Sequence, residues 1–339
     1  DSGSVRLTNL MGIFRQLGYG VTFFPDNRAY AGKYTRNLQQ AGVEVVYTPW
    51  IESFTEFFRT QGGEFDYIFI SRHYIATNYV LLLKRYCPEA KFIFDTVDLH
   101  YLRERRLAEL EKSRTLKIAA YQTRRAELSV IKAADATLVV SPIEKDVLAK
   151  DSPGSLVHVL SNIHPVPGRG KGFSERKDIY FIGGYQHPPN SDAACWFVND
   201  VWPLIHEKLP DMQFHLVGSK APDKVRSLKG EGVVFHGYVE NLEPFLNDCR
   251  LAIAPLRYGA GVKGKVNMSM AYGQPMVVTP TAAEGLFAEH EKQLLLAEDA
   301  ESFADEVVRL YQDEDLWYRL SDASIKNVEE HFSIQAARE

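Results

Sequence analysis

The segment Pro255–Lys265, with the sequence PLRYGAGVKGK, combines glycines and lysines in a way that suits the binding of a phosphate group. Its glycines carry no Cβ, so backbone amides can approach a ligand closely. A helix is predicted to begin near Lys265, and a helix N-terminus offers free N–H groups and the positive end of a dipole. Lys263 and Lys265 add two cations where that dipole disfavours them unless an anion binds. The pattern predicts a diphosphate site, and a flexible glycine loop with two solvated lysines is the alternative.

The spacing in this segment matches neither the Walker phosphate loop nor the dinucleotide-binding fingerprint. A second candidate follows the apolar run Met276–Thr279, where the chain continues as PTAAEGL and supplies Glu284. A carboxylate beyond the end of a buried strand can accept hydrogen bonds from sugar hydroxyls. The alternative is an acid at a helix N-terminus that complements the helix dipole.

Polar side chains also follow two predicted strands of the N-terminal half. Asp98 and His100 come after the run Phe92–Asp95, and a histidine there could accept a proton or donate a hydrogen bond near neutral pH. The alternative is that Asp98 caps the next helix and that His100 lies on the helix surface. Arg72 follows the run Tyr67–Ile70 and places a cation at another strand end.

Short apolar runs alternate with longer amphipathic stretches along most of the chain. The runs are continuous rather than alternating, which is typical of buried parallel strands. The predicted strands are Val21–Phe24, Val43–Tyr47, Tyr67–Ile70, Phe92–Asp95, Thr137–Val140, Val157–Leu160, Ile179–Ile182, Phe214–Val217, Val233–Phe235, Leu251–Ala254, Met276–Thr279 and Leu294–Leu296.

Helices are predicted between these strands and after the last of them. Asn190 is expected to cap the helix that begins near Ser191. The stretch Tyr101–Ala134 is dense in Arg and Glu and predicts one long helix with a solvated face. The last stretch, Asp315–Glu339, is predicted to be helical throughout, whereas Asp1–Ser4 reads as a loop whose preceding strand is missing from the sequence.

Strands and helices in turn indicate an α/β protein with parallel sheets. Residues 161–177 interrupt the alternation with prolines, glycines and charges, so a linker is expected there. The sequence therefore predicts two doubly wound, Rossmann-like domains that face a central cleft, at residues 1–160 and 178–322. Ligands of such sheets bind beyond the carboxyl ends of the strands.

Composition excludes some classes of function. The formal net charge is -5, which argues against general nucleic-acid binding. The three cysteines are far apart and form no CxxC or Cys/His cluster, so no zinc site is expected and a reducing compartment is the natural interpretation. No apolar stretch is long enough to predict a transmembrane helix.

The order of the motifs resembles that of retaining GT-B glycosyltransferases, the group 1 or family-four class. The resemblance is carried by GAGVKGKVNMSMAYGQPMVVTPTAAEGL, FIGGYQHPPN and FHLVG, and it covers nearly the whole C-terminal half. It implies that the glycines line the donor phosphates, that the lysines neutralise the diphosphate and that the acid lies near the donor sugar. The donor-binding residues implied in this way are Gly183, Gly184, Gly259, Gly261, Lys263, Lys265, Glu284 and Gly285.

The N-terminal half resembles the acceptor-binding domain of the same class, which implies catalytic roles for Asp98 and His100 together with Lys265. The first loop of such domains approaches a phosphate or the acceptor, so the resemblance places Gly3 and Arg6 there, and Arg72 is a further candidate for the acceptor or a phosphate in another strand-end loop. It also implies that residues 323–339 form a terminal helix that crosses back to the N-terminal domain. This sequence departs from the family pattern at Ala260 and Met268, where many members carry two glutamates eight residues apart.

The resemblance implies a metal-independent hexosyltransferase that moves a sugar from a nucleoside diphosphate sugar to a carbohydrate or glycolipid acceptor, with retention, in cell-surface polysaccharide synthesis. No metal or further cofactor is expected, since the nucleoside diphosphate sugar is a co-substrate. A cytoplasmic location is expected, and a lipid-linked acceptor would bring peripheral contact with the inner face of the membrane. The alternatives are a non-catalytic nucleotide-sugar-binding module of a larger assembly and a nucleotide-sugar epimerase of the same architecture.

Overall fold

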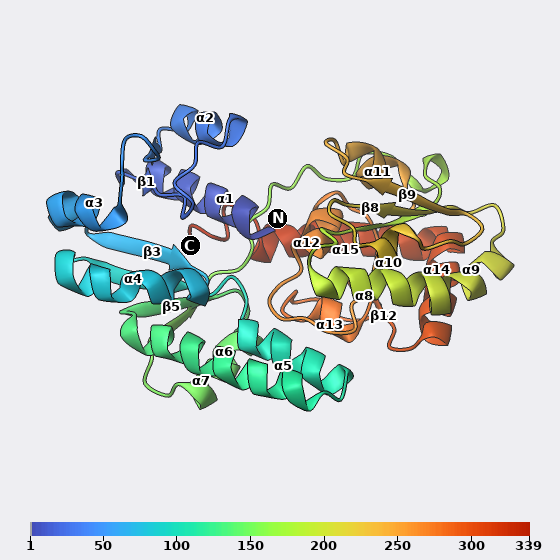
Figure 1. The fold of residues 1–339 in the computed structure, drawn as a ribbon. Helices are drawn as coiled ribbons and strands as arrows, with labels where there is room; N and C mark the ends of the chain where they lie inside the picture. Colours follow the sequence, from blue (N-terminus) through green and yellow to red (C-terminus); the bar gives the residue numbers. More distant parts are fainter. Residues whose placement is uncertain (1) are drawn as a thin grey trace. The chain divides into compact units, whose positions relative to one another are not determined.

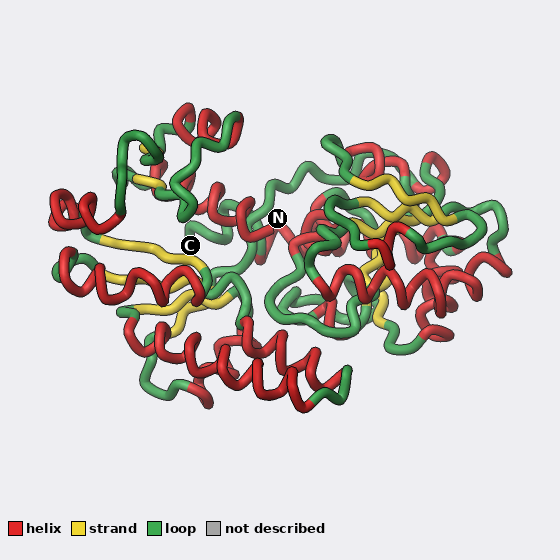
Figure 2. The backbone as a smooth tube through the Cα atoms, viewed as in Figure 1, coloured by secondary structure: helices red, strands yellow, loops and turns green. Residues whose placement is uncertain are grey.

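The computed structural model of the protein describes residues 2–339, and most of them fall into two compact units, residues 3–163 and residues 164–337 (Figure 1). The boundary lies inside the segment predicted as a linker. Both units are built from parallel strands and helices, so the predicted α/β fold with two Rossmann-like domains is confirmed. Figure 2 shows the strands inside each unit and the helices around them.

The N-terminal unit contains two separate parallel sheets. A four-stranded sheet has the order β3-β4-β5-β6, and β1 pairs with β2 in a sheet of their own. These strands are β1 (Thr22–Phe23), β2 (Glu44–Val45), β3 (Tyr67–Ser71), β4 (Lys91–Asp95), β5 (Ala136–Val139) and β6 (Val157–Val159). The helices are α1 (Ser2–Gln16), α2 (Lys33–Gln40), α3 (Phe54–Gln61), α4 (His73–Tyr86), α5 (His100–Leu110), α6 (Arg114–Ala133) and α7 (Pro142–Asp151), with a 3₁₀ turn at Gly62–Glu64.

The C-terminal unit contains a six-stranded parallel sheet with the order β12-β11-β10-β7-β8-β9. Its strands are β7 (Ile179–Ile182), β8 (Phe214–Val217), β9 (Val233–Gly237), β10 (Leu251–Ala254), β11 (Met276–Val278) and β12 (Leu295–Leu296). Its α-helices are α8 (Pro188–Trp196), α9 (Trp202–Lys208), α10 (Asp223–Arg226), α11 (Glu243–Asp248), α12 (Gly264–Ala271), α13 (Pro280–Ala283), α14 (Ala300–Gln312) and α15 (Glu314–His331). A π-helical turn, Phe197–Val201, joins α8 to α9, and Phe173–Glu175 is a 3₁₀ turn.

The central strands of this sheet are covered on both faces, which explains their continuous apolar sequences. Every residue of β10 and β11 is buried. Phe197 and Phe214 have no exposed surface and form an aromatic core with Trp202, and Phe181, also without exposed surface, packs against Tyr185. Burying side chains of this kind contributes roughly 1.5–3 kcal/mol each relative to leaving them in water.

All the predicted strands are present, with ends within two residues of the predicted ones. Some helix predictions were wrong. The first residues form the start of α1 rather than a loop, while Asp1 lies outside the described residues. The stretch Tyr101–Ala134 contains two helices, because Lys112 adopts a left-handed backbone and the Ser113 hydroxyl caps α6.

The last helix also differs from the prediction. It begins at Glu314, ends at His331 and contacts α12 and α14 of its own unit, so residues 332–339 are not part of it. Asn190 does not cap α8, since the N-cap position is His187 and Asn190 lies inside the first turn.

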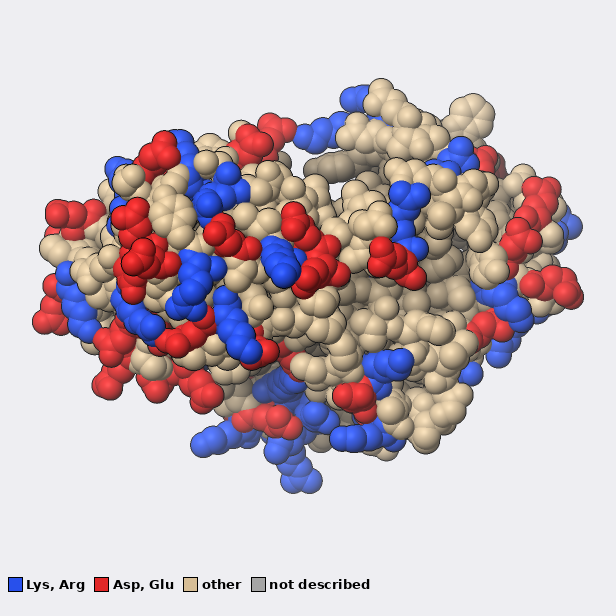
Figure 3. Space-filling model, turned by 180° about the vertical axis from the view of Figure 1, so that it is seen from behind, with Lys and Arg blue, Asp and Glu red and all other residues tan. Residues whose placement is uncertain are grey.

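In Figure 3, acidic and basic side chains are intermixed on the left of the view, basic side chains gather at the lower edge, and much of the remaining face is uncharged. Among residues 2–339, no helix has both the length and the apolar character needed to cross a membrane.

Candidate functional site

The strand order of the C-terminal sheet reverses between β7 and β10. The chain leaves β7 outward through β8 and β9, and it returns on the other side of β7 as β10. In doubly wound sheets, ligands bind beyond the carboxyl ends of the strands at this switch point. The loop with Gly183 and Gly184 follows β7, and the loop at residues 255–263 follows β10. The two glycine-containing segments predicted from the sequence therefore lie at the expected ligand position.

Asn190 and Lys265 join these two loops. The Lys265 ammonium donates a hydrogen bond to the Asn190 Oδ1, and the Asn190 amide nitrogen donates to the Gly184 carbonyl oxygen at 2.9 Å. The same ammonium lies 4.4 Å from the centre of the Phe181 ring, a cation–π distance. The position of Lys265 is thus fixed by the first turn of α8 and by β7.

Lys263 is buried at the N-cap position of α12. Its ammonium donates hydrogen bonds to the carbonyl oxygens of Gly261 at 2.6 Å and Ala260 at 3.3 Å. Gly261 has a φ of 66°, a left-handed conformation that glycine adopts at little cost. Gly259 lies against the same side chain, since a Cβ there would be 3.4 Å from the Lys263 Cε.

The electrostatics of this region favour an anion. Desolvation, together with the nearby charge of Lys263, lowers the pKa of Lys265 to about 7. Both lysines stand at the N-terminus of α12, whose dipole also disfavours cations. No carboxylate of residues 2–339 is at ion-pair distance from Lys265. A bound diphosphate would offset these unfavourable terms, because it would bring negative charge to both ammonium groups and to the helix end.

The loop after β7 leaves no room for a side chain at Gly218, the residue directly after the neighbouring strand β8 (Phe214–Val217). A Cβ on Gly218 would lie 1.7 Å from the Gly183 carbonyl oxygen. Gly184, by contrast, has no atom within 4 Å of such a Cβ. The tight approach of β8 therefore fixes the backbone at Gly183 and leaves Gly184 open.

Glu284 and Gly285 follow α13, the short helix after β11. Glu284 is the C-cap residue, directly after that helix, and is half-buried, and Gly285 has a φ of 76°. Thr279, which precedes the helix, caps it and also donates a hydrogen bond to the Leu256 carbonyl oxygen at 2.5 Å. This bond ties the β11 loop to the loop after β10. Glu284 is thus not at a helix N-terminus, and the dipole-complementing alternative does not apply.

In the N-terminal unit, Arg6 is buried inside α1 rather than in a phosphate-binding loop. Its guanidinium donates to the Asp95 carboxylate at 2.7 Å and to the carbonyl oxygens of Leu160 and Ser161. The Ser71 hydroxyl donates to the same Asp95 oxygen at 3.0 Å. Arg6 therefore joins α1 to the ends of the strands, and Gly3 lies in the first turn of that helix.

The other N-terminal candidates gather at the carboxyl ends of β3 and β4, which are neighbours in the sheet. Arg72 lies directly after β3 with a φ of 73°, and Val97 after β4 has a φ of 65°. Left-handed backbone is rare for residues other than glycine and is concentrated at functional loops. Asp98 is bound by the Arg103 guanidinium and does not cap α5, whose N-cap residue is Leu99.

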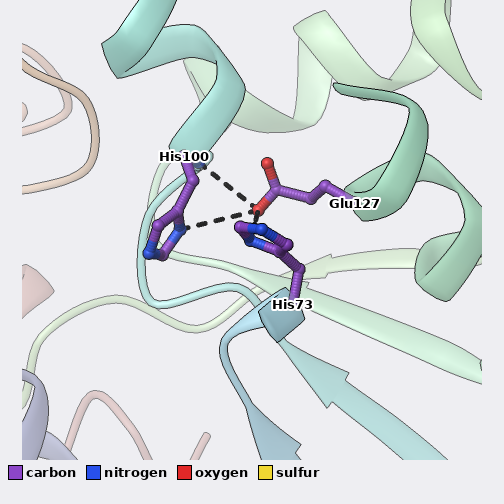
Figure 4. Close-up of side chains that lie close together, drawn as sticks. All are labelled: His73, His100 and Glu127. Atoms are coloured by element: carbon purple, nitrogen blue, oxygen red, sulfur yellow. Dashed lines mark hydrogen bonds and ion pairs between the residues drawn. The ribbon is translucent and has the colours of Figure 1, made fainter. Parts of the chain in front are cut away.

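His100 is the first residue of α5 and forms a cluster with His73 of α4 and Glu127 of α6 (Figure 4). The Glu127 Oε1 lies 3.7 Å from the His100 Nδ1 and 3.8 Å from the His73 Nδ1. The two imidazole rings meet edge to face, with centres 4.9 Å apart. Glu127 has no exposed surface.

Two histidines and a glutamate within 4.8 Å of one another are residue types that can bind zinc. The hydrogen bonds do not suit that role. The His100 Nδ1 lies 3.0 Å from the Asp98 carbonyl oxygen, and a carbonyl oxygen can only accept, so this nitrogen carries a proton. It then has no lone pair for a metal ion. In this arrangement the Glu127 carboxylate accepts backbone N–H groups of α5 and lies at ion-pair distance from both imidazole rings.

Sequence reasoning missed three residues of these sites. Asn190 was expected to be a helix cap, although it binds Lys265. His73 directly follows Arg72 at a strand end, and this adjacency was the available signal. Nothing in the sequence around Glu127 distinguishes it as a functional residue, because it lies in a stretch rich in acidic and basic residues, which are usually solvated.

Most of the C-terminal unit is similar to a known family. Residues 176–313 match the model of the family Glycosyl transferases group 1, which confirms the resemblance drawn from the sequence. A protein of Klebsiella pneumoniae, described as an uncharacterized 44.6 kDa protein in the cps region, is 27% identical over 176 residues. That alignment covers 49% of this chain and 45% of the relative, so it spans less than half the length of the curated protein.

The whole chain has the GT-B fold of solved glycosyltransferases. It resembles HepE of Anabaena, crystallised with UDP and glucose, with a TM-score of 0.75 at 13% identity, covering 100% of this chain and 94% of that one. Sucrose-phosphate synthase of Thermosynechococcus elongatus has a TM-score of 0.72 at 15% sequence identity, and the match covers 97% of this chain and 89% of the synthase. TarM has a TM-score of 0.67 at 13% sequence identity, and the match covers 84% of this chain and 55% of TarM. At these identities the likeness establishes the fold.

Proposed function

We propose that this protein is a glycosyltransferase that moves a sugar from a nucleoside diphosphate sugar to a carbohydrate acceptor. The observation that carries the proposal is the pair Lys263 and Lys265 at the N-terminus of α12, at the switch point of the sheet, with no carboxylate paired to Lys265. Two adjacent cations at a helix N-terminus suit the charge of a diphosphate.

The leaving group of such a reaction is the nucleoside diphosphate, which gains negative charge as the bond between the sugar C1 and the phosphate oxygen breaks. Lys263, Lys265 and the α12 dipole would stabilise that charge without a metal ion, and preorganised charge of this kind is a large contribution to catalysis. The bond from the acceptor oxygen to C1 forms on the same face of the sugar, and the acceptor proton passes to the departing phosphate. The product would then retain the configuration of the donor.

The donor is proposed to be a UDP-sugar, since HepE was crystallised with UDP-glucose and TarM of S. aureus with UDP. The Klebsiella relative from a cps region supports a role in polysaccharide synthesis. Free and lipid-linked carbohydrates are the two acceptor classes to compare.

The test is release of nucleoside diphosphate from a panel of nucleotide sugars, with and without carbohydrate acceptors. The Lys265→Met variant is compared with Lys229→Met, which removes an exposed lysine from a loop of the same unit. Turnover by the wild type and by Lys229→Met, but not by Lys265→Met, is the expected result. Donor binding without turnover for every pair would instead indicate a nucleotide-sugar-binding module, and isomerised sugar without an acceptor would indicate an epimerase.

A further inference from the structure

The N-terminus of α5 is held by glutamates from two other helices. The Glu127 carboxylate accepts the backbone N–H groups of His100 at 3.3 Å and Tyr101 at 3.1 Å. The Glu144 carboxylate on α7 accepts the N–H of Leu99 at 2.9 Å. Leu99 occupies the N-cap position and has no side chain that could satisfy these donors. Glu127 therefore does for α5 what a capping side chain usually does, and it fixes the backbone of His100.

The same carboxylate faces the imidazole of His100 from the side of Nδ1 (Figure 4). This nitrogen carries a proton, because it donates to the Asp98 carbonyl oxygen. Nε2 lies on the opposite edge of the ring, directed away from Glu127 in Figure 4. His100 is thus held with one nitrogen inside the protein and the other available to a ligand.

Charge balance favours a protonated imidazole here. Glu127 is fully buried, and the cationic partners at ion-pair distance among the described residues are His73 and His100. A buried carboxylate is costly unless it is paired and hydrogen-bonded. The rings of His73 and His100 are 4.9 Å apart, so two positive charges would repel and one shared charge is favoured.

The pKa shifts of the two histidines agree with a single positive charge located on His100. Desolvation is the largest influence on His100, but the nearby carboxylates of Glu127 and Asp98 outweigh it and raise the pKa above the usual histidine value. Desolvation lowers the pKa of His73. The other charged groups that face the pair are Arg103 and Glu104 on α5.

We propose that Glu127 is a positioning residue for the transferase reaction: it fixes His100 as an imidazolium whose Nε2–H is presented to an oxygen of the substrate, with His73 as its uncharged neighbour. This inference rests on the proposed function. Its chemical consequence is a hydrogen-bond donor that is present at low pH and lost as the pH rises through the pKa of His100.

The first experiment needs no substrate. Histidine-selective ¹⁵N NMR of the whole protein follows each ring through a pH titration, and the signals of His73 and His100 are assigned with His73→Gln and His100→Gln. The wild type should show a protonated Nδ1 on His100 and a midpoint above the usual histidine value. A neutral His100 with its proton on Nε2 would overturn the proposal, even if no Glu127 variant folds.

The second experiment compares Glu127→Gln with Glu109→Gln, which removes an exposed carboxylate from α5. Removing the charge of Glu127 should lower the His100 midpoint by about one pH unit or more. The pH at which kcat for donor turnover falls on the alkaline side should decrease together with the His100 midpoint, while KM for the donor changes little. Glu109→Gln should move neither.

The outcomes separate the two proposals. If the NMR midpoint moves but no nucleotide sugar is turned over by the wild type, the transferase proposal fails and the Glu127–His100 pairing stands. If the wild type turns over a donor and Glu127→Gln leaves the pH profile unchanged, Glu127 is only structural and the positioning role is overturned.

Discussion

Lys265 donates a hydrogen bond to the Oδ1 of Asn190, so a lysine at the start of α12 is oriented by an amide in the first turn of α8. The amide nitrogen of Asn190 in turn donates to the Gly184 carbonyl oxygen. One side chain thus fixes both the cation and the glycine loop at the switch point of the sheet.

Replacing Asn190 by Ala should weaken nucleotide-sugar binding. The substitution removes a hydrogen bond to the charged Lys265, which is worth about 1.5–3 kcal/mol, or roughly a tenfold or greater rise in Kd. Titration calorimetry with the donor found in the panel measures this change. Asn199→Ala, an exposed position in the turn after α8, is the matched control and should leave Kd unchanged. Equal affinities for the two variants would remove Asn190 from the site.

Donor affinity should depend on the protonation of Lys265. Its pKa in the free protein is lowered to about 7, so the ammonium is charged below that pH and neutral above it. A bound diphosphate favours the charged form, so binding above pH 7 requires proton uptake, and Kd should rise by up to about tenfold per pH unit. Calorimetry in buffers of different ionisation enthalpy measures the proton uptake directly.

The control for this pH dependence is Lys265→Arg, because an arginine stays charged throughout the range. The variant should bind with a nearly constant Kd across the same pH values. The diphosphate of a nucleotide sugar carries no titrating group there, so a slope that persists in the arginine variant would show that another group of the protein titrates.

Gly218→Ala should destabilise the C-terminal unit. The added Cβ would lie 1.7 Å from the Gly183 carbonyl oxygen, so β8 or the glycine loop must move, at a cost of about 2 kcal/mol or more. Chemical denaturation gives the change in the free energy of unfolding. Gly184→Ala is the matched control, because its Cβ has no neighbour within 4 Å and the stability should stay the same. Similar losses in both variants would contradict the packing described for this loop.

Arg6→Met should destabilise the N-terminal unit by about 3 to 5 kcal/mol, since it leaves the buried Asp95 carboxylate without its cation. The exposed pair of Arg59 and Glu56 supplies the control, and Arg59→Met should change the free energy of unfolding far less, because water screens this pair. Chemical denaturation of the two variants and the wild type measures the free energies of unfolding that this prediction compares. An unfolding free energy unchanged by Arg6→Met would return this residue to the list of ligand-binding candidates.

The sheets could be predicted from the sequence because buried parallel strands leave a local signal. Runs such as Leu251–Ala254 are apolar at every position, and turns or amphipathic helices flank them. Lys263 and Lys265 could be found for a similar reason, since glycines, cations and a helix start occur within a few residues.

Contacts between residues far apart in the chain could not be predicted, because they leave no local pattern in the sequence. Arg6 looked like part of a loop because its partner Asp95 lies far along the chain. Glu127 looked like one more solvated acid on a charged helix, although it is fully buried beneath two histidines. The break at Lys112 depends on a single left-handed residue within a stretch of helix-forming side chains.

The central claim is that the C-terminal unit binds a nucleoside diphosphate at the switch point between β7 and β10. Hydrogen–deuterium exchange with and without saturating UDP tests it most directly, because backbone amides that cradle phosphates exchange more slowly when bound. Protection is expected in residues 183–192 and 257–266, and it should be reduced in Lys265→Met. Exchange that is unchanged in both segments, or protection confined to other parts of the chain, would contradict it.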